Sequence, residues 1–152
     1  MWVFAGVLVA LAAIVAALLS FKFIFMPQSS VQAPSKSSSA QTPVFAPSGE
    51  LTPSFPKELI LDDAAKLSQS YLINYSTSTK QYTANFTSSD TMLSLYQNYK
   101  KYFASNGWTV VNDTTSYTTS RGLYVRKGTT DASVAIIDQG KTRSVVVSYL
   151  QN

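Results

Sequence analysis

The sequence predicts an α+β fold, in which an N-terminal transmembrane helix and a linker precede an antiparallel sheet packed against one helix. Three observations lead to this prediction. The 152-residue chain opens on a long apolar run, a Ser/Pro-rich stretch follows, and the remainder alternates like strands around one stretch with helical periodicity. We therefore divide the chain into a transmembrane anchor (1–26), a flexible linker (27–55) and a globular domain (56–152).

The apolar run extends from Met1 to Phe21 and contains no charged side chain. A bilayer core about 30 Å thick needs about 20 apolar residues in a helix, so this run is long enough to cross it. A cleaved signal peptide is disfavoured, because no basic segment precedes the run and no small-residue cleavage site directly follows it. We expect an uncleaved signal anchor, a single-pass membrane location and the lipid bilayer as a partner.

Two observations bear on the orientation of the chain in the membrane. Lys22 lies on the C-terminal side of the run, which by the positive-inside rule weakly favours a cytoplasmic domain. The domain is rich in Ser and Thr and the chain has no Cys, which is typical of proteins outside the cytoplasm. We expect the folded domain to be extracytoplasmic, in the cell envelope.

The segment 27–55 has the composition of a linker. Pro27 ends the apolar helix, and the residues that follow are mostly Ser, Pro, Ala and Gln. Such a stretch buries too little apolar surface to offset the entropy lost on ordering. We expect it to be partly extended and flexible.

One helix is predicted in the globular domain. Ser89 or Asp90 is expected to cap its start, and Asn106-Gly107 to end it, with Trp108 folding back onto the helix. The apolar residues recur at helical spacing and form one stripe: Met92, Leu95, Tyr96, Tyr99, Tyr102 and Phe103.

Strands are predicted on both sides of this helix, in the order ββαββββ. Tyr82, Ala84 and Phe86 alternate with polar residues, which is typical of a half-buried strand. A similar alternation over 70–75 and a turn over 76–79 indicate a hairpin before it. Further strands are expected after the helix, at 108–111, 123–126, 133–137 and 144–149.

The block from Phe86 to Trp108 resembles a recurrent type of protein. A strand, a polar cap, a helix with Tyr-x-x-Tyr-x-x-Tyr-Phe and then Asn-Gly-Trp-Thr-Val are similar to small, uncharacterised, single-pass membrane-anchored bacterial proteins with a compact α+β domain. The resemblance implies an architecture and transfers no site residues. Type IV pilins share the general plan, but the chain lacks their basic leader and the glutamate near the start of their helix.

The composition excludes several kinds of chemistry. Without Cys or His, the chain has no Cys/His metal site, no Cys nucleophile and no His general base. The carboxylates fall in predicted turns and at the helix cap, so we expect no enzyme activity, no cofactor and no metal; a Ser-Lys nucleophile pair is the one arrangement that composition leaves open. The net charge of +4 is scattered, which disfavours nucleic acid as a partner.

The last strands predict an apolar second face on the sheet. Val134 and Ile136 point to one side of their strand, so Ala135 and Ile137 point to the other, although one helix covers only one face. The candidate partner-binding residues on this second face are Tyr124, Arg126, Ile137 and Val146. The alternative is that nearby apolar residues fold back over it: Phe55, Leu59, Ile60 and Leu61.

These expectations lead to two functions. The first is a membrane-anchored extracytoplasmic binding or structural module, whose partner is an envelope protein or a wall component. The alternative is an accessory subunit of a membrane complex held through its transmembrane helix, where small residues such as Gly6 and Ala10 recur at helix-packing spacing. The many aromatic residues have the spacing of core packing rather than of a sugar-binding platform.

Overall fold

The computed structural model describes residues 41–115 and 118–152. The predicted transmembrane helix and the first part of the predicted linker lie outside the described residues. Within the described ranges, no helix has the length and apolar character needed to span a membrane.

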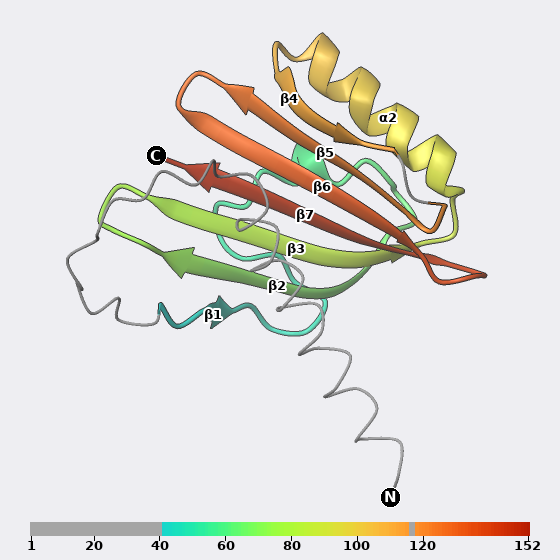
Figure 1. Cartoon of the computed structure of the whole chain (residues 1–152). Coiled ribbons are helices and arrows are strands. Elements are labelled where there is room, and N and C mark those ends of the chain that lie inside the picture. The colour runs from blue at the N-terminus through green and yellow to red at the C-terminus, as the bar shows by residue number, and fades with distance from the viewer. Residues whose placement is uncertain (1–40, 116–117) are drawn as a thin grey trace, which may run out of the picture. The chain divides into compact units, whose positions relative to one another are not determined.

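A single antiparallel sheet forms the domain, in the strand order β1-β2-β3-β7-β6-β5-β4. Figure 1 shows this order from edge to edge, with α2 beside β4 and β5. The strands are β1 (Val44–Phe45), β2 (Lys66–Asn74), β3 (Lys80–Ser88), β4 (Thr109–Thr114), β5 (Ser120–Lys127), β6 (Thr130–Asp138) and β7 (Arg143–Gln151). The α+β class and the predicted ββαββββ order are confirmed, with the short β1 added at one edge.

The α-helix among the described residues, α2 (Met92–Ser105), follows the predicted span closely. Thr91 caps it, because its extended backbone lets its hydroxyl accept a hydrogen bond from the Ser94 amide; the expected caps, Ser89 and Asp90, lie just outside. Gly107 ends the helix with a positive φ of 76°, where a side chain would be strained.

Two elements cover the same face of the sheet, which we call the core face. The helix packs against β4, β5 and β6. The segment before β2, which contains a short 3-10 helix η1 (Lys57–Leu59), packs against the same core. Tyr99 of α2 joins the two elements by donating a hydrogen bond to the Leu59 carbonyl at 2.8 Å. The buried hydrophobic sheet residues of this face are Tyr82, Ala84, Phe86, Leu123, Val125, Ala132, Val134, Ile136, Val145 and Val147.

The alternative in which the segment before β2 folds back over the second face is wrong. Phe55 and Leu59 belong to the core cluster, and Ile60 and Leu61 pack against it. The core face needs them because α2 spans only the β4–β6 half of the sheet. They lie with the helix on the core face.

The linker expected over 27–55 includes ordered structure in its described part. Strand β1 pairs with β2 through Val44 and Phe45. Thr52 is buried, and its backbone amide donates to the Ser70 hydroxyl at 3.0 Å. Phe55 is 4% exposed. The ordered part of the domain therefore extends to the N-terminal side of the predicted boundary at residue 56.

We predict that Phe55→Ala lowers the free energy of unfolding by about 3–5 kcal/mol, as expected for deleting a buried ring. Urea unfolding of the full chain in detergent, with Trp2→Phe in every protein so that Trp108 is the single fluorescent reporter, measures this change. The matched control is Phe45→Ala, because Phe45 is 53% exposed and its ring lies beside the Tyr71 ring at the edge of the sheet. The control should cost no more than about 1.5 kcal/mol. Equal costs for both variants would contradict a core that includes Phe55.

Candidate binding surface

Strand register divides the sheet residues between the core face and a second face. Residues directly opposite one another on neighbouring strands share a face. In one such row, Gly122, Ala135, Val146 and Asn85 lie side by side across β5, β6, β7 and β3. The second face comprises this row and the residues in step with it, including Tyr71, Ile73, Thr83, Tyr124, Arg126, Asp131, Ser133, Ile137, Ser144, Ser148 and Leu150.

All four candidate residues lie on this second face. Tyr124 is half-buried, Arg126 is exposed and Ile137 is 37% exposed. Val146 differs from expectation, because it is only 6% exposed. It occupies a central strand with neighbours on both sides, so it forms the floor of the surface and does not offer a side chain for contact.

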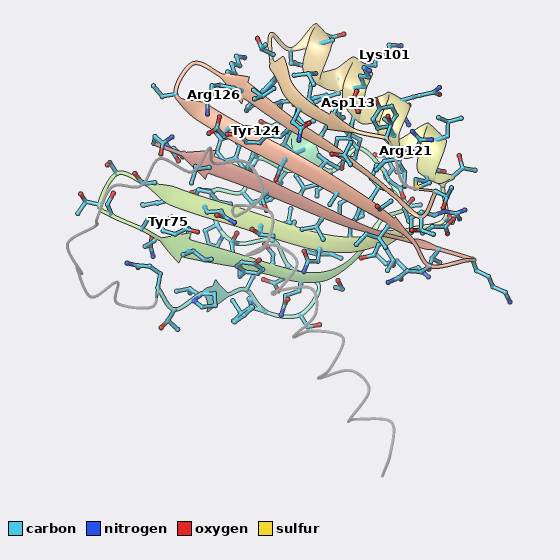
Figure 2. All side chains as sticks on the ribbon, viewed as in Figure 1. Tyr75, Lys101, Asp113, Arg121, Tyr124 and Arg126 are labelled. Carbon is cyan, nitrogen blue, oxygen red and sulfur yellow. The ribbon has the colours of Figure 1, made fainter. Side chains whose placement is uncertain are left out.

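Tyr124 and Arg126 form a cluster with Asp131, which we call the Tyr-Arg-Asp cluster. The Arg126 guanidinium donates to both oxygens of Asp131, with Nε–Oδ1 at 2.6 Å and Nη2–Oδ2 at 3.1 Å. The same guanidinium donates to the Tyr124 hydroxyl at 3.0 Å. Figure 2 shows Tyr124 and Arg126 next to each other near one end of β5. A bidentate pair fixes the orientation of the guanidinium as well as its position.

The electrostatics of this cluster follow from these hydrogen bonds. Arg126 holds the pKa of the Asp131 carboxyl below its ordinary value. The Asp131 carboxylate in turn raises the pKa of Arg126. Burial, together with the nearby Asp131, raises the pKa of Tyr124. The cluster is therefore a fixed ion pair with a protonated phenol beside it at neutral pH.

Asp131 was predicted to lie in a turn, whereas it lies in β6 and pairs with Arg126. The hairpin between β5 and β6 places the two residues directly opposite each other. Gly128, with a φ of 61°, lies in the turn between them. The signal in the sequence is the position of Arg126 and Asp131 on either side of a Gly-centred hairpin turn.

Most of the second face is uncharged. Of the charged residues on the described strands, only Lys66, Arg126 and Asp131 are in register with it. Hydroxyl groups occupy its middle, where the Thr83 and Ser148 oxygens are 3.1 Å apart. At the β1 edge, the exposed Phe45 ring lies 5.5 Å from the Tyr71 ring. Among the described helices, none packs against this face.

A second polar cluster lies on the helix side and has a structural explanation. Tyr96 of α2 donates to the Asp113 carboxylate of β4 at 2.6 Å, and Lys100 pairs with the same oxygen at 3.0 Å. The Arg121 guanidinium lies 5.3 Å from the centre of the Tyr96 ring. The Tyr96 hydrogen bond, supported by Lys100 and Arg121, lowers the pKa of Asp113. These contacts join α2 to the edge of the sheet.

The described residues contain no group of three or more acidic side chains that could hold a metal ion. Comparisons of the chain with protein-family models, curated proteins and solved structures find no match. The resemblance to small membrane-anchored bacterial proteins therefore stays a prediction.

We predict that Asp131→Asn destabilises the domain at neutral pH and that its effect disappears in acid. Because the folded pKa of Asp131 lies below the unfolded value of about 3.9, its ionisation stabilises the fold fully above about pH 5. That stabilisation is lost as the pH falls through the folded pKa. Melting curves of both proteins from pH 7 to pH 2.5 measure the difference.

Asp113 also has a lowered folded pKa, so it adds its own pH dependence to the stability of the domain. Asp113 is intact in both proteins, so its contribution cancels in the comparison. A difference in melting temperature between native protein and Asp131→Asn that stays constant across the whole pH range would contradict the ion pair.

Proposed function

We propose that the protein is a membrane-anchored extracytoplasmic module that binds another envelope protein through its second face. The observation that carries the proposal is the combination of the Tyr-Arg-Asp cluster with a largely uncharged sheet face against which no described helix packs. In this role the chain acts by binding and carries out no catalysis of its own.

The chemistry of the second face favours a protein partner. Small molecules are bound mainly in concave pockets, whereas broad sheet faces suit macromolecules. The centres of protein interfaces are depleted of charged residues and enriched in Tyr and Arg. Here Tyr124 and Arg126 lie beside a row of neutral residues, and Asp131 neutralises the one arginine of the face. Removing water from such a surface costs less than removing it from unpaired charges.

The location of the module is inferred from the sequence. The uncharged run from Met1 to Phe21 supports a membrane anchor, and the Ser/Thr-rich, Cys-free domain supports an extracytoplasmic position. In the alternative function, the chain is an accessory subunit held in a membrane complex through its anchor helix. The two differ in which part of the chain the partner recognises.

We predict that a photo-crosslinking amino acid at Ile137 or at Tyr124 gives one discrete adduct of the same mass in living cells. The matched control position is Leu93, which is 51% exposed on α2. Leu93 should give no such adduct, because the helix lies on the other face of the sheet. Gel mobility and mass spectrometry of the purified adducts provide the readout.

Two outcomes of this experiment would count against the proposal. Absence of an adduct from both second-face positions would contradict it, as would equal adducts from these positions and from Leu93. A third arm exchanges residues 1–26 for an unrelated transmembrane helix. Retention of the adduct supports the surface module, whereas its loss supports the accessory subunit.

We predict that Ser38→Cys is labelled by a membrane-impermeant maleimide in intact cells. The native chain has no Cys, so this substitution gives a single reporter. Labelling in intact cells is the result expected for an extracytoplasmic domain. Protection in intact cells with labelling after lysis would place the domain in the cytoplasm, as the position of Lys22 suggests.

A further inference from the structure

A cleft of about 500 Å³ opens on the core-face side of the domain, away from the second face. It lies where the C-terminal end of α2 meets η1 and the adjacent ends of β5, β6 and β7. This volume falls within the range of small-ligand sites, roughly 300–1,000 Å³. Its lining residues are Pro56, Glu58, Leu59, Tyr102, Asn106, Trp108, Lys127, Thr130 and Tyr149.

The aromatic wall of the cleft is held rigidly from behind. Trp108 contacts the fully buried Phe103 ring edge-on, with centroids 5.7 Å apart, and the Tyr149 ring at 6.5 Å. The Trp108 amide donates to the Phe103 carbonyl at 3.0 Å, and Gly107 supplies the turn before it. Tyr102 packs edge-on against Phe103 at 5.6 Å. These rings need little reordering to receive a ligand, which favours binding.

The polar groups of the cleft balance one another in charge. Glu58 supplies one negative charge and Lys127 one positive charge, and the side chains of Asn106 and Thr130 are neutral. Lys127 is held in place because its Nζ donates to the Asn106 carbonyl at 3.0 Å. Burial and then the nearby Glu58 charge raise the pKa of Tyr102, so its hydroxyl stays protonated and able to donate. The site thus offers both donors and acceptors without a net charge.

We propose that this cleft binds a neutral saccharide. The flat C–H faces of a pyranose ring stack on aromatic side chains, and its hydroxyls need the mixture of donors and acceptors found here. A phosphate or other strong anion would meet Glu58 together with Lys127, so the charges would offset. A purely apolar ligand would cover the polar groups of the cleft without offering them partners, which costs about 1–3 kcal/mol for each group taken out of water.

Burial distinguishes these aromatic residues from the packing residues that the sequence pattern identifies. Tyr99 and Phe103 of the helical stripe are completely buried. Tyr102, Trp108 and Tyr149 are only partly buried beside the core, and each lines the cleft. The saccharide site is therefore separate from the second face. It adds a second binding function to the proposed binding of a protein partner.

Tryptophan fluorescence can test this site directly. The chain has two tryptophans, so Trp2→Phe in the full chain leaves Trp108 alone as the reporter within the cleft. The protein is kept in a detergent without a sugar headgroup and titrated with neutral tetrasaccharides of glucose and of N-acetylglucosamine. We expect a saturable change in Trp108 emission with at least one of them, and none with inorganic phosphate at equal concentration.

Three variants then assign the binding to the cleft. Glu58→Gln and Lys127→Gln change exposed side chains, so the domain should keep its melting temperature while saccharide affinity falls about tenfold, equivalent to about 1.4 kcal/mol. Tyr124→Ala, on the second face, should leave saccharide affinity unchanged. Conversely, Glu58→Gln should leave the crosslink from Ile137 intact, so the two proposals fail separately.

The proposal is overturned if none of the tetrasaccharides changes Trp108 emission at millimolar concentration, or if phosphate competes with them. It is also overturned if Glu58→Gln and Lys127→Gln bind saccharide as well as the native cleft does.

Discussion

The contact between α2 and the sheet is the interaction on which the rest of the domain depends. Tyr99 and Phe103 are completely buried between the helix and the strands. Burial raises the pKa of Tyr99 far above its ordinary value, and its hydroxyl is used in the hydrogen bond to Leu59. This one bond ties the helix to the segment before β2. The two covering elements therefore close the core face together, and neither spans the sheet alone.

Covering one face in this way determines where binding surfaces can form. The core face is filled with aromatic and branched apolar residues, and a cleft remains where α2 and η1 diverge near Trp108. The second face carries hydroxyl, amide and aromatic groups. Thr83 and Val146 in its middle are buried, whereas Tyr124 is half-buried and Arg126 and Ile137 are exposed. Arg126 and Lys127 are consecutive in β5 and so point to opposite faces. The first belongs to the Tyr-Arg-Asp cluster, and the second lines the cleft.

Local periodicity in the sequence predicted the elements but not all of their contacts. The helix, its end at Gly107 and the hairpin over 76–79 depend on nearby residues and agree with the structure. The exact cap differed, because Ser, Asp and Thr residues follow one another and all can cap a helix. Phe55 was assigned to the linker, because the segment around it is rich in Pro and Ser and only tertiary contacts place its ring in the core.

The sequence predicted which side of the sheet the candidate residues occupy, but it did not predict the Tyr-Arg-Asp cluster. Alternation alone predicted that four residues lie on one side of the sheet, and the strand register agrees: Tyr124, Arg126, Ile137 and Val146. The pairing of Arg126 with Asp131 and the burial of Val146 required strand register and neighbours. The cleft could not be predicted, because its lining residues Glu58, Trp108 and Tyr149 lie far apart in the chain and only the fold brings them to one place.

Thiol reactivity tests most directly the central claim that one face is covered and the other is accessible. Because the chain has no Cys, S133C, S148C and S70C each give a single thiol. Ser133 and Ser148 are opposite each other on the second face, whereas Ser70 is completely buried on the core face. In the native full chain, S133C and S148C should react with a small maleimide far faster than S70C. If their thiols react as slowly as the S70C thiol, the second face is covered and cannot serve as a binding surface.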